Sequence, residues 1–214
     1  MKAYRKLFNS YLNNSLKLEK WQKIGVFGLV IVLAGVFGWL YEFVLYYFDG
    51  GMTDWFLQGG NFLPWINIYA TGSIFVAITV RKIKKNPLLV FLVSLVVTGI
   101  TEYISGWLVY TLGNGTRYWD YNQEIWNFGN IDGFICLRSV MFFAISSMML
   151  IYLMIPACVY LSQKINKKVF LTISIFLFTI FMADEFYNLV IANVFDLPNA
   201  MEVYKSLGFK YVEF

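Results

Sequence analysis

Five apolar stretches separated by polar segments occupy most of the chain between residues 24 and 194. A transmembrane helix needs about 20 apolar residues to cross a hydrocarbon core about 30 Å thick. Four stretches reach that length, at about residues 24–48, 87–112, 133–163 and 170–194. The stretch at 64–80 is slightly short, so we expect part of the preceding segment to dip into the membrane. The pattern predicts an all-α polytopic membrane bundle of about five transmembrane helices.

Prolines indicate where these helices begin and bend. Proline is tolerated in the first turn of a helix, where its missing N–H would have no partner, so we expect Pro64 and Pro87 to open the second and third spans. The fourth stretch is longer than a bilayer requires at about 1.5 Å per residue. We therefore expect tilt or a bend near Pro156.

Polar segments flank the apolar part of the chain. Residues 1–23 carry apolar side chains at helical spacing, which predicts an amphipathic helix on the inner membrane surface: Tyr4, Leu7, Phe8, Tyr11 and Leu12. The long charged stretch there is unlike a cleaved signal peptide. We divide the chain into a cytoplasmic amphipathic lead-in at 1–23, a transmembrane helical domain at 24–194 and a short extracytoplasmic tail at 195–214.

The distribution of charge predicts how the chain crosses the membrane. The sequence is 59% hydrophobic and only 14% charged, and thirteen of its 17 lysines and arginines lie before the first span, in 81–85 or in 164–168. Under the positive-inside rule these segments stay in the cytoplasm. The predictions are a multi-pass protein of the bacterial inner membrane, an N-terminus inside, a C-terminus outside, the lipid bilayer as a partner and no nucleic-acid partner.

Charged side chains inside the spans are the strongest candidates for function. A charge in the hydrocarbon region costs at least about 2.5–3.5 kcal/mol, so each needs a partner, water or a ligand. Counting along the spans places all five in the outer half of the membrane: Glu42, Glu102, Arg138, Asp184 and Glu185. Four acids and one base at one depth predict an outward-facing pocket, with the C-terminal tail folding back on its mouth.

The third span has the clearest functional face. Ser94, Thr98, Glu102 and Gly106 recur every four residues, and small side chains on one face let a neighbouring helix approach. Tight packing alone would explain the small residues, but it explains Glu102 poorly. For Arg138, the alternative to a role in the pocket is a purely structural ion pair with one acid.

Geometry on the fifth span separates two acids that are neighbours in sequence. Asp184 and Glu185 point about 100° apart on a helix, so we expect only one to face the bundle interior. Glu42 is the shallowest acid, and the alternative to a place in the pocket is a position at the membrane interface. If two or three carboxylates share the pocket, a proton or a bound cation is needed to neutralise them. The full predicted substrate-binding set is Glu42, Trp65, Asn67, Tyr69, Glu102, Tyr103, Trp119, Asp120, Arg138, Asp184 and Glu185.

Residues for metal or redox chemistry are scarce. The chain has no histidine, and Cys136 and Cys158 are 22 positions apart on one predicted helix, about 33 Å and beyond disulfide reach. We expect no metal and no cofactor.

Several motifs resemble the putative type IV ABC-transporter permease family of small bacterial membrane proteins. The resemblance covers roughly residues 35–150 and implies membership of that family without fixing a substrate. Its motifs are Trp39-Leu40-Tyr41-Glu42-Phe43, Gly60-Asn61-Phe62-Leu63-Pro64-Trp65 with Ile68-Tyr69 and Gly72, Thr101-Glu102-Tyr103-Ile104-Ser105-Gly106-Trp107, Tyr118-Trp119-Asp120-Tyr121, and Asn127 with Gly133-Phe134-Ile135-Cys136-Leu137 and Ser139.

The chain departs from this family at several positions. The second acid that follows the span-three motif in the family is missing near Tyr110, the entry to the second span is poorer in proline and glycine, and a span-four tryptophan is replaced around 141–143. The chain shows no P-loop, so coupling to an ATPase is not visible in it. Besides a small-molecule or lipid ligand, the candidate partners are another membrane subunit or an ATPase.

Three functions fit these observations. The first is transport or binding of a small cationic or amine-bearing solute through carboxylates and aromatic faces. The second is an intramembrane enzyme acting on lipid headgroups or lipid-linked substrates, with Glu102 and Asp184 or Glu185 as acid and base and Arg138 holding a phosphate. The third is a non-catalytic membrane partner or immunity protein. The sequence leaves open whether the protein is an enzyme.

Overall fold

The computed structural model is all-helical and describes residues 2–49, 60–113, 115, 117–123 and 126–209. Its internal contacts divide the chain into two compact units. The first unit consists of Met1–Leu18 with Thr71–Tyr160, and the second consists of Glu19–Ala70 with Leu161–Phe214. Each unit is assembled from segments far apart in sequence, so long-range packing determines which residues meet.

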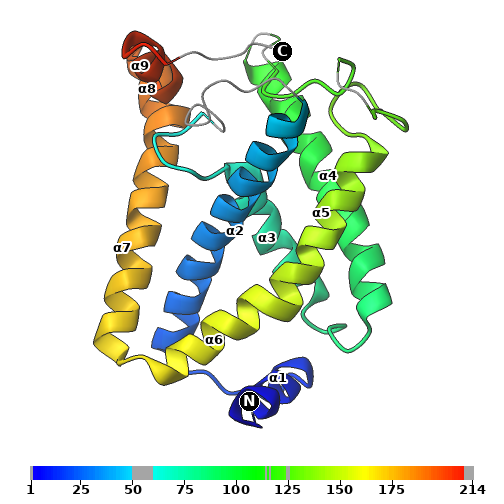
Figure 1. The fold of residues 1–214 in the computed structure, drawn as a ribbon, viewed down its shortest axis with the longest axis vertical. Helices are drawn as coiled ribbons and strands as arrows, with labels where there is room; N and C mark the ends of the chain where they lie inside the picture. The colour runs from blue at the N-terminus through cyan, green and yellow to red at the C-terminus, as the bar shows by residue number, and fades with distance from the viewer. Residues whose placement is uncertain (1, 50–59, 114, 116, 124–125, 210–214) are drawn as a thin grey trace. The chain divides into compact units, whose positions relative to one another are not determined.

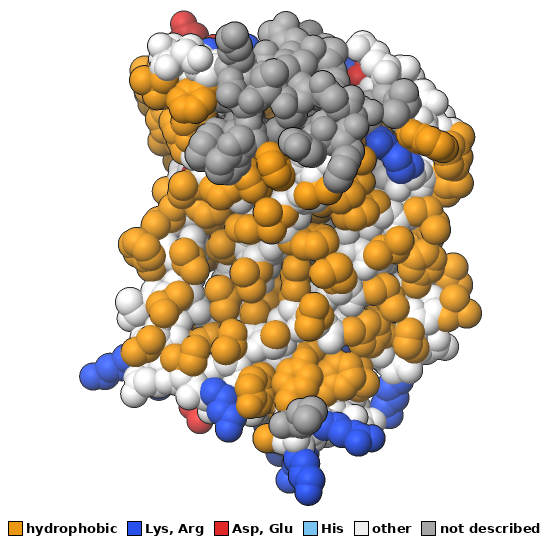
Figure 2. All heavy atoms as spheres, in the orientation of Figure 1, with side chains coloured by type: hydrophobic (Ala, Val, Ile, Leu, Met, Phe, Trp, Pro, Cys, Tyr) orange, Lys and Arg blue, Asp and Glu red, His pale blue; other side chains and the backbone are white. Residues whose placement is uncertain are grey.

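Four helical stretches of the described chain are long and apolar enough to cross a membrane: Lys20–Leu45, Pro87–Leu112, Leu137–Lys164 and Lys167–Phe195. Even a stretch of 26 residues extends about 39 Å, which exceeds the hydrocarbon thickness. Hydrophobic side chains cover the visible flanks of these helices (Figure 2). The predicted multi-pass membrane protein is confirmed. The fifth predicted span is a shorter apolar helix, α3 (Asn67–Val80).

The first unit is built around α4 (Pro87–Leu112) and α5 (Leu137–Met149), which pack against each other (Figure 1). The buried face of α4 consists of Val90, Ser94, Thr98, Gly99, Glu102 and Gly106. This face contains the whole predicted four-residue stripe. At Gly99 a methyl group would contact the Val140 side chain of α5, so the small residues do allow close helix approach.

The start of α4 follows the sequence signal. The Asn86 side chain accepts a hydrogen bond from the Leu89 N–H at 3.1 Å, and Pro87 occupies the first turn. Asparagine is among the best N-cap residues, and proline there loses no helical hydrogen bond. The predicted start of the third span is confirmed.

The fourth span begins later than predicted and changes its helical hydrogen bonding along its length. Residues 131–136 form turns and an isolated bridge between Ile131 and Ile135, so the helix begins at Leu137 rather than Gly133. A π-helical segment, η2 (Leu150–Met154), joins α5 to α6 (Ile155–Lys164). Pro156 lies just after it and cannot donate a backbone hydrogen bond, and such interruptions commonly accompany irregular helix geometry.

The N-terminal helix α1 (Lys2–Leu12) turns its apolar face toward the protein. Leu7 and Tyr11 are buried, and the Tyr4 ring packs edge-on against Tyr160 with centroids 5.4 Å apart. The predicted helix is confirmed, and its face contacts the rest of the first unit near the turn from α3 to α4 (Figure 1).

A buried lysine attaches α1 to this unit. Lys84 Nζ donates to the Tyr11 carbonyl at 2.8 Å and lies 3.5 Å from the centroid of the Tyr11 ring. The Tyr152 hydroxyl of η2 in turn donates to the Lys84 carbonyl at 2.8 Å. A cation at the last carbonyls of a helix also interacts favourably with the helix dipole.

Docking of α1 is therefore expected to depend on pH. Burial lowers the pKa of Lys84 from 10.5 to about 8, so a state with α1 released binds more protons between these values. Docking should strengthen as pH rises, and the open fraction should fall about tenfold between pH 7 and pH 9. Above pH 10 it should weaken again, because burial, with a smaller contribution from Tyr152, raises the pKa of Tyr11.

Hydrogen exchange of the α1 amides, corrected for the intrinsic rate at each pH, measures this fraction. A Lys84→Met variant keeps the aliphatic packing and should lose the change between pH 7 and pH 9. The same change in both proteins would contradict the assignment to Lys84.

The second unit packs α2 (Lys20–Asp49) against α7 (Lys167–Phe186). Glycines on α2 make this possible, because Gly25 lies against the Phe170 ring and Gly28 lies against Cβ and Cγ of Phe178. Beyond α7 the chain continues through η3 (Tyr187–Ile191), α8 (Ala192–Phe195) and α9 (Ala200–Ser206).

Candidate functional site

Asp184 and Glu185 are both buried near the end of α7, with 8% and 6% of their surfaces exposed. The prediction that only one faces the interior of the protein is wrong. Helix geometry does separate their directions, but residues 61–67 pass around α7 and supply hydrogen-bond donors to both side chains.

The donors to Asp184 are mostly backbone amides. Its Oδ1 accepts from the Phe62 N–H at 3.0 Å and from Asn188 Nδ2 at 2.8 Å, and its Oδ2 accepts from the Leu63 N–H at 3.0 Å. Hydrogen bonds to an ionised acceptor are stronger than those between neutral groups. Asp184 therefore fixes the backbone of residues 62 and 63.

The donors to Glu185 are side-chain amides. Its Oε1 accepts from Asn61 Nδ2 at 3.0 Å and its Oε2 from Asn67 Nδ2 at 3.1 Å. Among the residues that the structure describes, neither Asp184 nor Glu185 has a basic side chain within ion-pair distance. Neutral donors lower the cost of burying these two charges, but they do not cancel the negative charge.

These contacts explain why α3 begins at Asn67 and not at Pro64 as predicted. The N–H groups of Phe62 and Leu63 are bonded to Asp184, and Asn61 Nδ2 also donates to the Trp65 carbonyl at 3.2 Å. Buried backbone outside regular helices is stable only where its polar groups find partners. The N–H groups of residues 62, 63, 65 and 66 meet that condition.

The C-terminal segment closes over this arrangement. Asn188 Oδ1 accepts from the Ala200 N–H at 2.8 Å, and the Tyr204 hydroxyl donates to the Phe62 carbonyl at 2.7 Å. Burial, and then the charge of Asp184, raise the pKa of Tyr204, which keeps the phenol protonated as a donor. Asn188 lies in η3, and π-helical segments occur frequently at functional sites.

The other predicted residues of this unit pack on α2. Trp65 lies against Gly35, and its ring centroid is 5.4 Å from that of Phe181. Its buried indole N–H faces Asp184 and makes no well-formed hydrogen bond with any residue that the structure describes. Tyr69 lies on Gly38 and Tyr41. Glu42 is half-buried. Their roles in ligand binding stay predictions.

A second buried carboxylate, Glu102, lies in the first unit with 3% of its surface exposed. Its Oε1 accepts from the Tyr121 hydroxyl at 2.7 Å, and its Oε2 accepts from Ser139 Oγ at 3.0 Å. The Arg138 guanidinium lies 5.7 Å from the centroid of the same Tyr121 ring. Tyr121 therefore connects the predicted acid and the predicted base of this unit.

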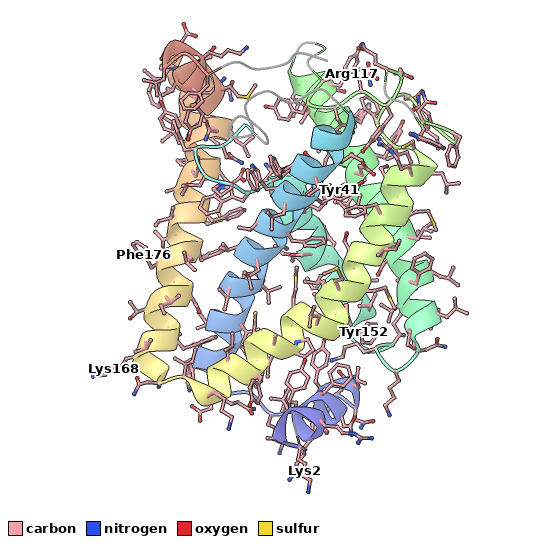
Figure 3. The ribbon with its side chains drawn as sticks, in the orientation of Figure 1. Lys2, Tyr41, Arg117, Tyr152, Lys168 and Phe176 are labelled. Carbon is pink, nitrogen blue, oxygen red and sulfur yellow. The ribbon has the colours of Figure 1, made fainter. Side chains whose placement is uncertain are left out.

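Tyr121 belongs to a folded connection between α4 and α5, residues 117–123 and 126–136, which we call the strap. Figure 3 shows Arg117 of the strap at the opposite end of the first unit from Lys2. Arg117 lies over the rings of Tyr110 and Phe134, with its guanidinium 4.9 and 4.6 Å from their centroids. Its Nη1 also donates to the Asp132 carbonyl at 2.9 Å.

Three predicted ligand residues bond to the strap or within it. Tyr103 donates to Asp132 Oδ2 at 3.0 Å, and Trp119 donates to the Phe134 carbonyl at 2.9 Å. Asp120 Oδ1 lies 3.6 Å from Arg117 Nη1. The predicted pocket includes these side chains, and any role in binding a ligand stays a prediction.

Among the described residues, four whose side chains hydrogen-bond to the buried carboxylates are missing from the predicted set: Asn61, Tyr121, Ser139 and Asn188. Asn61, Tyr121 and Ser139 lie within the motifs of the family resemblance, which was the available signal. Asn188 is one helical turn after Asp184, so the spacing alone could have identified it.

The chemistry available to these groups is acid, amide and phenol chemistry. Within the described ranges, no three of the residue types histidine, cysteine, aspartate and glutamate are grouped to hold a metal ion. Both cysteines are buried and free of disulfides. Glu102 and Arg138 belong to the first unit and the other three charges to the second, and the chamber shared by all five stays a prediction.

Comparison with known proteins gives the family. No curated protein and no solved structure matches the chain significantly. The family described as "Putative ABC-transporter type IV" matches residues 29–189, which include both buried carboxylate sites and most of the long apolar helices. The chain therefore belongs to the ABC-transporter type IV family.

Proposed function

We propose that the protein is the membrane component of a transporter and that it binds a small solute carrying a positive charge or an amine. The observation that carries the proposal is the pair Asp184 and Glu185, buried together with neutral donors. A cation reduces the cost of this buried negative charge, while a neutral solute does not.

Membership of an ABC-transporter family supports the transport part of the proposal. The chain contains no P-loop, so the energy of ATP hydrolysis would come from a separate ATPase subunit. Four long apolar helices supply the membrane anchorage that such a component needs.

Thermal unfolding of the purified protein tests ligand binding. We would screen sodium, ammonium, choline, spermidine and cationic amino acids, and we expect at least one to raise the unfolding midpoint by several degrees, because ligand that binds only the folded state stabilises it. The effect should disappear in Glu185→Gln. Asp196→Asn is the matched control, because it removes an exposed carboxylate of the same unit where asparagine also tolerates the left-handed backbone. An unchanged midpoint with every cation would contradict the proposal.

A further inference from the structure

We infer that α1 and the turn between α3 and α4, residues 81–86, together form a docking surface for the headgroups of anionic phospholipids. We call it the basic surface. It consists of seven exposed side chains: Lys2, Arg5, Lys6, Lys17, Arg81, Lys82 and Lys85. The inference is independent of the proposed solute, because none of these residues belongs to the carboxylate sites.

The positive charge at this end of the first unit is not balanced by the segments that build it. Residues 2–18 and 71–101 contain eight lysines and arginines and no aspartate or glutamate, and both segments belong to the first unit. Lysine and arginine side chains are visible on α1, at the edge of the hydrophobic flanks of the helices (Figure 2), and Lys2 points away from the rest of the unit (Figure 3). Like charges at this density repel one another, so an anionic partner stabilises the surface.

A buried lysine joins the two segments into one surface. Lys84 of the turn has 7% of its surface exposed, and its Nζ donates to the Tyr11 carbonyl of α1 at 2.8 Å. Among the residues that the structure describes, no carboxylate lies within ion-pair distance of this ammonium group. Lys84 therefore adds an uncompensated positive charge behind the exposed ones. Anionic headgroups on the surface supply the opposite charge that the chain itself does not.

The position of the cations favours a lipid over an acidic protein. Arg81 directly follows the last residue of α3, and Lys85 lies two residues before the start of α4. Large apolar side chains are exposed within three residues of these cations, with Ile78 59% and Leu88 67% exposed. A phospholipid matches both features, because its phosphate meets the cations while its acyl chains lie along the apolar side chains. An acidic protein would match only the charges.

The prediction of topology agrees with this partner. Under the positive-inside rule the basic segments lie on the cytoplasmic side, where anionic lipids give the leaflet a negative surface potential. Clusters of four to eight lysines and arginines next to a transmembrane helix are typical of binding to such lipids. The basic surface has this number of cations on a single compact unit.

Photochemical cross-linking in nanodiscs measures the lipid preference and locates it. The full-length protein is reconstituted in phosphatidylcholine that carries a trace of either phosphatidylglycerol or phosphatidylcholine with a diazirine on the acyl chain near the glycerol. Mass spectrometry of peptides then gives the ratio of anionic to zwitterionic cross-linking at residues 2–18 and 71–90. We expect a ratio of about five or more, because each lysine or arginine near an anionic surface contributes about fivefold in affinity. A ratio near one would overturn the lipid surface and would leave an acidic protein as the partner of these cations.

Two triple variants show whether charge causes the preference. Arg81→Gln with Lys82→Gln and Lys85→Gln should lower the ratio at residues 71–90 to near one. Arg81→Lys with Lys82→Arg and Lys85→Arg changes the same three positions and keeps all three charges, so it should retain the ratio of the parent protein. The same ratio in both variants would overturn the inference.

The second segment provides an independent variant if the glutamine substitutions in the turn lower the unfolding midpoint. Lys2→Gln with Arg5→Gln and Lys6→Gln removes three exposed cations from α1 and should lower the ratio at residues 2–18. High salt should lower the ratio in the parent protein as well, because ions screen exposed charges. A ratio that neither the α1 variant nor salt changes would show that the cations do not select the lipid, and it would overturn the basic surface.

Discussion

Replacing Asp184 by alanine should lower the free energy of unfolding by about 3–5 kcal/mol. The substitution removes the acceptor for the Phe62 and Leu63 N–H groups and for Asn188 Nδ2. Each buried donor left without a partner costs about 1–3 kcal/mol, and little water is available at membrane depth to replace the lost bonds. The loss should be concentrated in residues 61–67 and in α9, because Phe62 also accepts from Tyr204.

Unfolding by denaturing detergent in mixed micelles measures the total effect, and hydrogen exchange locates it. Asp196→Asn serves again as the control, with an expected change below about 0.5 kcal/mol for an exposed residue outside the helices. The loss of unfolding free energy in Asp184→Asn should lie between the losses in Asp184→Ala and Asp196→Asn. The asparagine amide keeps one acceptor oxygen, but it places its own N–H groups beside another N–H donor. A loss in Asp184→Ala no larger than in Asp196→Asn would show that Asp184 does not hold the segment.

The features that local sequence determines were predictable. The four-residue stripe of α4 depends only on helical periodicity, and its predicted face is the buried face. Asn86 and Pro87 likewise specify the start of that helix through their own geometry. Apolar length was sufficient to identify the four long helices.

Features that depend on distant segments could not be read from local patterns. Helix geometry correctly separates Asp184 and Glu185 by direction, but nothing near them in sequence shows that Asn61 and Asn67 approach from 118 or more residues away. The same holds for Tyr121, whose bond to Glu102 depends on how the strap folds back. Pro64 has the signature of a helix start, and the hydrogen bonds to Asp184 override it.

The carboxylates also illustrate why buried charge and fold are linked in this protein. Asp184 and Glu185 together organise the segment that leads into α3, and Asn188 extends the same network to α9. A solute that takes over one of these acceptors would release part of that network. Binding at these groups is therefore expected to change the conformation of residues 61–67, the segment most directly attached to them.

Gly38→Ala should be the most damaging methyl addition in the second unit, with a loss of about 2–3 kcal/mol. The new Cβ would overlap Cγ and Cδ2 of Tyr69 and would lie 2.8 Å from its Cβ, all atoms near the base of a rigid side chain. Overpacking of this kind costs about 1–3 kcal/mol because backbone or ring must shift. Gly72→Ala is the matched control, since among the described residues no atom outside its own stretch of helix lies within 4 Å of the added methyl group.

A double-mutant cycle identifies the cause of the loss. Tyr69→Ala alone should destabilise the protein by leaving a cavity, but in that background Gly38→Ala should cost almost nothing, because the overlapping ring is gone. The same detergent-unfolding measurement gives all four free energies. If Gly38→Ala costs as much without the Tyr69 ring as with it, close approach of Tyr69 to α2 is not what requires glycine at this position.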